Sequence, residues 1–318
     1  MELSRIVYGC ASKAMIAGED VCELLDRVLE SGVNVFDTAE NYGLSECSLG
    51  NWISSRNNRD RIHIITKGCH PYGRDRVTPE DIKTDIEQSF VRLKTDHIDT
   101  YLLHRDDSKV PVGPLVEILN EYHKAGRIGR FGGSNWTVTR IKEANKYAAD
   151  HGLEPFTISS PHYGIAVQSR DPYGGSDGCV NISGPGMEKE REFYEISGMP
   201  VLAYSSLGRG FFTGRVKSGE PEKAAEVLDE FAVKGYCWPE NFERLKRAEE
   251  MAERKNATVP QIALAWLLNQ KMNVYPIVSS NNIDRFKENV GALEITLSED
   301  ELNCFLQPQN AESCRVKM

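Results

Sequence analysis

The sequence predicts a (β/α)8 barrel from two observations: eight short apolar runs with the composition of buried strands, and segments of helical periodicity between them. The runs are four to six residues long and rich in β-branched and aromatic residues, which is typical of strands covered on both faces. They begin near residues 6, 33, 62, 98, 128, 156, 200 and 274. Strands that alternate with helices form parallel sheets, and eight such units close most economically into a barrel.

Two of the segments between these runs show a clear helical period. Residues 21–29 place valines and leucines on one face of a helix. Residues 82–93 repeat this pattern, and Thr78-Pro79-Glu80 ahead of them supplies a cap and a first turn. We therefore expect helices between the strands along the whole chain.

An open, doubly wound sheet is the competing architecture. Such a sheet normally carries GxGxxG after its first strand, whereas this chain reads GCASKAMIAG there. Two connections, at about 164–198 and 205–257, are longer than a barrel requires, and both follow strand ends where ligands bind. We interpret these connections, after the sixth and seventh strands, as covers for substrate and cofactor; surface insertions are the alternative. Residues 1–318 are expected to form one domain.

Composition and charge exclude several classes of protein. With 40% hydrophobic and 27% charged residues, the 318-residue chain can bury an extensive core. Its net charge of −9 argues against a nucleic-acid surface, because such surfaces are basic. No run approaches eighteen apolar residues, and the N-terminus lacks the pattern of a signal peptide. We expect a cytoplasmic protein with no membrane partner.

The eight cysteines form no CxxC pair, and no histidine stands at metal-ligand spacing from them. We therefore expect mostly reduced thiols and no metal site. The cysteines are Cys10, Cys22, Cys47, Cys69, Cys179, Cys237, Cys304 and Cys314.

Polar side chains follow four successive apolar runs. The carboxyl ends of barrel strands meet at one rim, so these side chains are expected to converge on one cavity. A single polar residue at a strand end is ordinarily a cap or a solvated loop residue, but four such ends favour a site. The residues are Asp37, Tyr42, Lys67, His104, Ser134 and Asn135.

These residue types suit carbonyl reduction, in which a hydride reaches carbon and a proton must reach the oxygen. A free tyrosine has a pKa near 10 and needs help to act as an acid at neutral pH. A neighbouring ammonium lowers that pKa, and a carboxylate keeps the ammonium charged. Tyr42, Lys67 and Asp37 supply these groups, and His104 can donate a hydrogen bond to the substrate oxygen.

The sequence resembles the aldo-keto reductase superfamily over nearly its whole length. The segment GVNVFDTAENYGLSE resembles the Asp-to-Tyr signature, ITKG the lysine strand and IDTYLLHRDD the histidine strand. The resemblance implies a catalytic tetrad of Asp37, Tyr42, Lys67 and His104, with Tyr42 as the proton donor. It also implies NADPH bound across the barrel mouth without a Rossmann unit.

The resemblance extends to segments that hold the cofactor. FGGSNW resembles the segment that binds the nicotinamide carboxamide, and LAYSSLGRGFFTGR the segment that stacks on nicotinamide and wraps the pyrophosphate. VYPIVSSNNIDRFKENVGAL resembles the adenine-end signature. An arginine at the ribose 2′-phosphate favours NADPH over NADH. The implied contacts are Ser134, Asn135, Ser160, Tyr204, Ser206, Leu207, Gly208, Gly210, Ser280, Arg285, Glu288 and Asn289.

Three positions depart from the family pattern. Ser160 stands where members often have glutamine, and Ser279 where a lysine is common, which leaves Arg285 as the main cation. No N-terminal hairpin precedes the first strand, so we expect the C-terminal helix at 298–305 to cover the barrel bottom.

Two other functions stay open. The same site can run in reverse as a sugar or polyol dehydrogenase. A slow-turnover, NADPH-binding redox-sensing subunit is the alternative from another class, and its marks are tetramer contacts and a membrane partner. Oligomeric state and substrate are not fixed by the sequence. The candidates for the substrate wall are Trp136, His162, Tyr163, Tyr236, Cys237 and Trp238.

Overall fold

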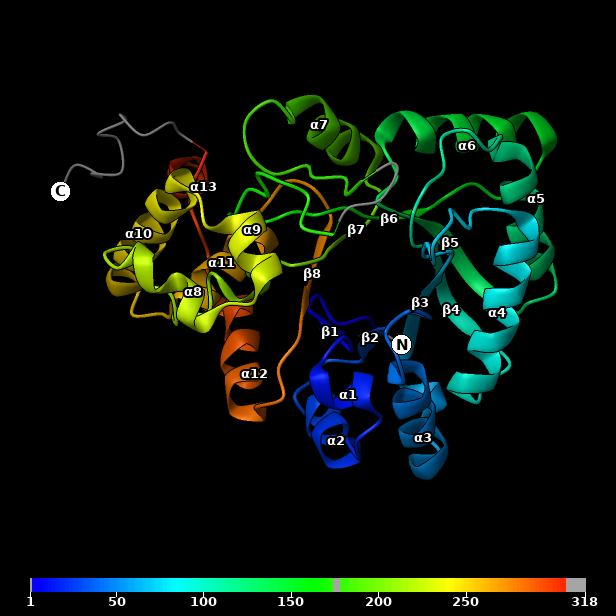
Figure 1. Ribbon diagram of the computed structural model, residues 1–318, viewed down its shortest axis with the longest axis horizontal. Coiled ribbons are helices and arrows are strands. Elements are labelled where there is room, and N and C mark those ends of the chain that lie inside the picture. Colours follow the sequence, from blue (N-terminus) through cyan, green and yellow to red (C-terminus); the bar gives the residue numbers. More distant parts are fainter. Residues whose placement is uncertain (1, 174–177, 307–318) are drawn as a thin grey trace.

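A closed barrel of parallel strands, taken in chain order, forms the centre of the computed structural model, which describes residues 2–173 and 178–306 (Figure 1). Each strand pairs with the next, and the last pairs with the first. The eight strands in the described residues are β1 (Val7–Gly9), β2 (Val35–Asp37), β3 (His63–Gly68), β4 (Ile98–Leu103), β5 (Ile128–Ser134), β6 (Ile158–Ser160), β7 (Val201–Ala203) and β8 (Val274–Val278). All eight predicted strands are confirmed.

Helices surround the barrel. The α-helices of the described residues are α1 (Lys13–Ala17), α2 (Cys22–Glu30), α3 (Ser45–Arg56), α4 (Pro79–Leu93), α5 (Val112–Lys124), α6 (Val138–His151), α7 (Glu188–Ser197), α8 (Ala224–Val227), α9 (Glu230–Tyr236), α10 (Pro239–Arg254), α11 (Val259–Leu268), α12 (Ile283–Val290) and α13 (Glu299–Cys304). Short 3-10 helices are η1 (Arg59–Arg61), η2 (Gly208–Gly210), η3 (Pro221–Lys223) and η4 (Gly291–Glu294). The predicted start of α4 is confirmed, because the Thr78 side chain accepts a hydrogen bond from the backbone N–H of Asp81 and Pro79 follows it.

Inward-facing apolar side chains fill the barrel interior: Val7, Val35, Ile65, Leu102, Ile158 and Leu202. Strand side chains alternate between faces, so the residue two positions further along also points inward. On β3 this step leads from Ile65 to Lys67. Just past β4 it leads from Leu102 to His104. The polar rim therefore stands directly above an apolar floor.

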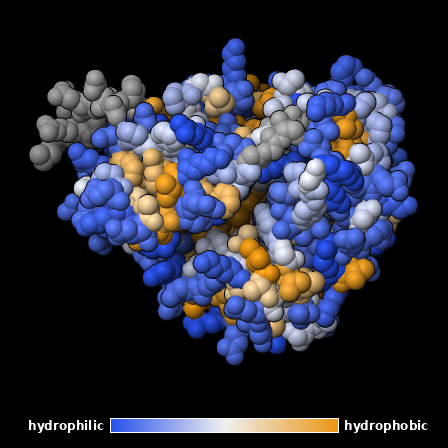
Figure 2. All heavy atoms as spheres, in the orientation of Figure 1, coloured by the Kyte–Doolittle hydropathy of each residue, from blue (hydrophilic) through white to orange (hydrophobic). Residues whose placement is uncertain are grey.

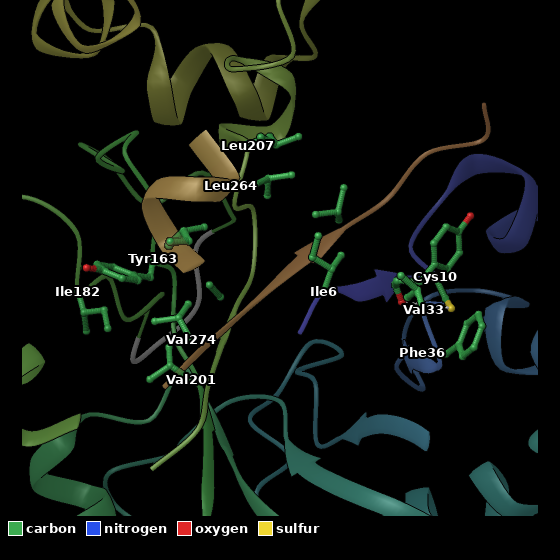
Figure 3. Packing of buried hydrophobic residues seen from close by; sticks show 14 of the residues in the cluster. Ile6, Cys10, Val33, Phe36, Tyr163, Ile182, Val201, Leu207, Leu264 and Val274 are labelled. Carbon is green, nitrogen blue, oxygen red and sulfur yellow. Dashed lines mark hydrogen bonds between the residues drawn. The ribbon is translucent and has the colours of Figure 1, made fainter. Parts of the chain in front are cut away.

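A second, larger core lies between the strands and the helices. Figure 3 shows part of it: Cys10 and Phe36 pack beside β1 and β2, and Val201 and Val274 beside β7 and β8. Outward-facing strand residues supply one side of this core and the helices supply the other, which fixes the helices against the barrel.

The two longest connections follow β6 and β7, as predicted. The first contains α7, and the second runs through α8, α9, α10 and α11 before β8. Both leave the carboxyl ends of their strands, so both are placed to cover the polar rim.

The expectation for the barrel bottom is wrong. α13 packs on the outside of the barrel, where the Trp266 indole donates to the Leu302 carbonyl (3.0 Å). Residues ahead of β1 cover the bottom instead. Leu3 packs against the inner layer, and the Arg5 guanidinium lies 4.8 Å from the centre of the Tyr275 ring.

Two further features concern the described residues. Free thiols occur at Cys10, Cys22, Cys47, Cys69, Cys179 and Cys237, whereas Cys314 lies outside these residues. Within the described part of the chain, no helix is long and apolar enough to cross a bilayer.

Candidate active site

A cavity of about 510 Å³ opens at the carboxyl ends of the strands. In Figure 2 this face is hollowed near its centre, beside an apolar patch over α8 and α9. Strand ends line the cavity on one side, and the connections after β6 and β7 line the other. The predicted site residues that it brings together are Asp37, Tyr42, Lys67, His104, Ser134, Asn135, Ser160, Tyr204, Ser206, Leu207 and Gly210.

A buried ion pair lies at the base of this cavity. The Lys67 ammonium donates to Asp37 Oδ1 (2.6 Å) and to the Thr38 carbonyl (2.8 Å). The two side chains are only 3% and 5% exposed. Burial raises the pKa of Asp37, although the ammonium opposes this rise. Burial also disfavours the ammonium, but Asp37, together with Tyr42 and Cys10, outweighs this effect, so the pKa of Lys67 is raised and the lysine stays charged.

Tyr42 lies beside this pair, with its ring centre 5.2 Å from Lys67 Nζ. The sequence predicts that the ammonium lowers the tyrosine pKa. In the structure the ammonium does lower it, but desolvation of the hydroxyl is the larger effect and raises the pKa overall. Tyr42 therefore keeps its proton at neutral pH, as a proton donor must.

His104 faces Tyr42 edge-on, with ring centres 5.7 Å apart. Burial, followed by the charge of Lys67, lowers the pKa of His104 well below its usual value. The imidazole is therefore neutral at pH 7 and carries one N–H. Its buried Nδ1 has no hydrogen-bond partner among the described residues. His70 also lies beside His104, at 5.0 Å between ring centres.

An amide and two hydroxyls form a connected group on the neighbouring strand ends. The Asn135 amide donates to the His104 carbonyl (3.3 Å) and to Ser134 Oγ (3.2 Å). Its oxygen accepts from the Tyr204 hydroxyl (2.8 Å). Asn135 has a positive φ of 58°, a conformation that asparagine tolerates better than most residues. The Ser160 hydroxyl is occupied by the Leu202 carbonyl (2.9 Å).

The loop after β7 turns tightly over the cavity. Ser205, Gly208, Arg209 and Gly210 have positive φ values of 50°, 58°, 50° and 103°. The loop is tied to β8 because Ser206 Oγ donates to the Ile277 carbonyl (2.5 Å). Gly208 is buried outside the cavity lining, so it shapes the loop from behind.

Two arginines of this segment line the cavity. Arg209 pairs with Asp229 at 2.7 Å and donates to the Tyr173 hydroxyl at 2.8 Å, and so bridges the connections after β6 and β7. Arg215 is exposed, and its Nε donates to Thr213 Oγ1 (3.2 Å).

The predicted adenine-end residues lie outside the cavity lining, beyond the end of β8. Ile277, Val278 and Ser279 line the cavity, and the chain then continues into α12. Ser280 Oγ donates to the Asn282 carbonyl (2.8 Å). The remaining three lie on α12, where Arg285 and Glu288 are exposed and Asn289 is buried.

The predicted substrate wall is wrong. Trp136 and Tyr163 are core residues, with Trp136 Nε1 bonded to the Arg105 carbonyl and the Tyr163 hydroxyl to Gln270. His162 lies behind Tyr204, at 5.7 Å between ring centres. None of the six candidates lines the cavity, and the other three are Tyr236, Cys237 and Trp238.

Sequence reasoning missed several residues that do line the cavity. His70 and Arg105 follow the third and fourth strands. A polar residue after a strand end is therefore the signal that identifies them, as it identifies Lys67. Tyr173 and Cys179 come from the irregular connection after β6, whose path no periodicity predicts.

Comparison with known proteins gives consistent similarities. The model of the Aldo/keto reductase family matches residues 5–305. An aldo-keto reductase, str7, of Strobilurus tenacellus is 30% identical over 287 residues, covering 88% of this chain and 78% of that protein. Norsolorinic acid reductase B of Dothistroma septosporum is 27% identical over 317 residues (95% and 74%). Norsolorinic acid reductase stcV of Emericella nidulans is 29% identical over 307 residues (90% and 71%).

Proposed function

Since the chain belongs to the aldo/keto reductase family, we propose that it reduces aldehyde or ketone carbonyls to alcohols with NADPH, and that Tyr42 donates the proton. The observation that carries the proposal is one cavity in which the Tyr42 ring lies 5.7 Å from the ring of a neutral His104 and 5.2 Å from Nζ of the Lys67–Asp37 ion pair. This arrangement provides a proton, a hydrogen-bond donor and a fixed positive charge around one point.

The proton path follows from these contacts. The Tyr42 hydroxyl and the His104 N–H bind the substrate oxygen and polarise the carbonyl. As the oxygen becomes negative, Tyr42 releases its proton to it, and the adjacent ammonium stabilises the phenolate that remains. Asp37 holds that ammonium in place and keeps it charged. Bound NADPH supplies the hydride.

Several observations support a fit between the cavity and a dinucleotide. The left-handed turn at Gly208–Gly210 brings Gly210 and the Arg209 side chain to the cavity lining. Arg209 and Arg215 add two guanidinium groups beside it. Asn135 and Ser134 offer amide and hydroxyl groups at the inner end, for the nicotinamide carboxamide, and the Tyr204 ring is available for stacking.

The preference for NADPH rests on α12 and the residue ahead of it. Ser280 and Arg285 are proposed to bind the 2′-phosphate, and Glu288 and Asn289 the adenine edge. The exposed Arg285 guanidinium has no ion-pair partner within the described residues, so it is available for a phosphate.

Reduction is favoured over the other functions. Relatives named norsolorinic acid reductases support a carbonyl substrate. Reverse operation as a sugar or polyol dehydrogenase uses the same groups with the proton moving from alcohol to Tyr42. A regulatory subunit with slow turnover has no need for the complete proton-transfer group that this cavity holds.

Tyr42→Phe tests the acid assignment. The variant removes the proton and keeps the ring, so we expect turnover to fall by roughly 10²-fold or more, with NADPH affinity unchanged within about threefold. Single-turnover oxidation of NADPH measures the first quantity, and fluorescence titration of NADPH measures the second. Undiminished turnover contradicts the assignment.

A further inference from the structure

Arg105 is a cation of the cavity that the proposed reaction does not use. It directly follows His104 past the end of β4 and lines the same cavity as Tyr42 and His70. Its charge acts on the site, because it helps to lower the pKa values of His104 and His70, after the larger effect of burial. Arg105 therefore lines the cavity close to both imidazoles.

The hydrogen bonding of this guanidinium is incomplete. Its side chain makes one hydrogen bond among the described residues, from Nη1 to the Cys179 sulfur at 3.2 Å. A thiol sulfur is a weak acceptor, and a guanidinium carries five N–H donors. The Arg105 Nε is buried without any partner in the described part of the chain. Leaving a partly buried charge without an oxygen acceptor is costly.

Other partly buried arginines of this protein have oxygen acceptors. Arg76, Arg92 and Arg140 each pair with a carboxylate, at 2.7, 2.9 and 2.8 Å. Arg244 has no such ion pair, but it reaches two carbonyl oxygens. Arg105 differs from all four, since its one acceptor is sulfur. Its missing acceptor is therefore expected to come from a ligand.

The cavity as a whole also favours an anion. Its described lining carries the cations Lys67, Arg105, Arg209 and Arg215 against the carboxylates Asp37 and Asp229. This excess is positive in a chain of net charge −9. Lys67 is neutralised by Asp37, and Arg209 and Arg215 lie at the turn assigned to the cofactor phosphates. Among the described cations of the lining, Arg105 is the one without a carboxylate partner or a proposed role at the cofactor phosphates.

We propose that Arg105 binds a carboxylate of the substrate, so that the preferred substrates are carbonyl compounds that carry an acid group, such as oxo acids. The inference rests on the proposed reductase function and adds the substrate class. A guanidinium presents two parallel N–H groups that match the two oxygens of a carboxylate. Because Arg105 adjoins His104, it fixes the acid group while the carbonyl lies between Tyr42 and His104.

A matched pair of aldehydes tests this assignment. 4-Carboxybenzaldehyde and methyl 4-formylbenzoate share the same ring and aldehyde and differ at one end, which is a carboxylate in the first and its uncharged methyl ester in the second. The ratio of their kcat/KM values therefore reports recognition of the acid. We expect the protein to prefer the acid by roughly tenfold or more at pH 7. Arg105→Met should bring the ratio close to one, mainly by raising KM for the acid. Arg105→Lys should retain part of the preference, because lysine keeps the positive charge but lacks the two parallel N–H groups of the guanidinium.

Arg170→Met is the matched control, since it removes an exposed guanidinium that stacks on Trp238 outside the cavity lining. It should keep the acid-to-ester ratio of the unaltered protein. Equal losses for acid and ester in Arg105→Met overturn the inference, and so does a loss of the ratio in Arg170→Met. If the unaltered protein turns over the ester and shows no preference for the acid, the proposed role of Arg105 is overturned but the reductase proposal is not. Absence of turnover with either aldehyde counts against the reductase proposal itself.

Binding of benzoate provides a readout that does not depend on turnover. Benzoate cannot be reduced, and isothermal titration into the protein with NADP+ reports its affinity. Arg105→Met should weaken this affinity by about tenfold, and Arg170→Met should not. An unchanged affinity in a folded Arg105→Met protein, checked by circular dichroism, contradicts the inference. A second pair, glyceraldehyde 3-phosphate and glyceraldehyde, tests for phosphate. If the ratio of kcat/KM values for this pair is larger than the ratio for acid and ester, the site binds phosphate and the carboxylate assignment is overturned.

Discussion

At the scale of single residues, the Lys67–Asp37 pair is proposed to assist proton transfer, and its burial also makes the fold sensitive to the loss of either partner. Both groups are almost completely removed from water. In the described residues the Lys67 ammonium donates to Asp37 and to the Thr38 carbonyl, and the Asp37 carboxylate accepts from Lys67. Removing one partner of such a pair leaves an uncompensated charge in the interior, which costs far more than losing a pair on the surface.

Lys67→Met should therefore lower stability as well as activity. We expect the free energy of unfolding to fall by about 3–5 kcal/mol, measured by urea denaturation. Lys146→Met is the control, because Lys146 pairs with Asp150 on the surface of α6, where the two side chains are 75% and 55% exposed. A change below about 1 kcal/mol is expected there. Equal effects for the two variants rule out this account of the buried pair.

A second residue-scale prediction concerns pH. Burial lowers the pKa of His162 to about 4, against 6.5 for a free histidine. Between these values the unfolded chain binds the proton and the folded chain does not, so stability falls as pH falls. This histidine contributes about 1.4 kcal/mol per pH unit across that window.

His162→Gln should therefore reduce the slope of unfolding free energy against pH between about 6.5 and 4. Urea denaturation at several pH values measures the slope. His151→Gln, at an exposed position on α6, should keep the original slope. An unaltered slope in His162→Gln shows that acid sensitivity arises elsewhere, for example at His63 or His70, whose pKa values are also lowered by burial.

At the scale of elements, the connections after β6 and β7 meet through one arginine. Arg209 lies over the rings of Tyr173 and Phe231, 5.4 and 5.3 Å from their centres, and pairs with Asp229. Tyr173 and Phe231 are themselves stacked, at 5.8 Å and 22°. Residues of both connections line the cavity, and the contacts of Arg209 link one connection to the other.

Arg209→Ala should therefore speed the release of the cofactor. We expect the dissociation rate of NADPH to rise by about tenfold, because the proposed phosphate contact and the link between the connections are lost together. Stopped-flow displacement measures this rate. Arg170→Ala, which removes a guanidinium that stacks on Trp238 outside the cavity lining, should leave the rate as it is. The same acceleration in both variants argues against a specific link.

At the scale of the whole molecule, the sequence predicts the barrel because its strands are buried on both faces. Such strands read as continuous apolar runs, and β3 and β4 show this most clearly. The placement of Lys67 and His104 follows from the same fact, since a polar residue at the end of a buried run has only the rim to occupy.

The cavity wall could not be predicted in this way. Trp136 is buried against Phe156, with ring centres 5.0 Å apart, and only the packed fold shows that it faces away from the cavity. Tyr173 and Cys179 reach the cavity through a connection without periodicity. The cover of the barrel bottom could not be predicted for a related reason. The residues ahead of β1 are too few to show a periodic pattern that indicates what they pack against.

Side chains two positions apart on a strand point to the same face, so the apolar interior and the polar residues above it depend on the register of each strand. This dependence limits which insertions the molecule can accept. Inserting one residue within β3 turns the Lys67 side chain from the interior toward the helices and takes Ile65 with it. Additions after β6 or β7 leave every strand in phase. New specificities can therefore arise by lengthening those two loops, whereas a change of length within β3 displaces Lys67 from the interior.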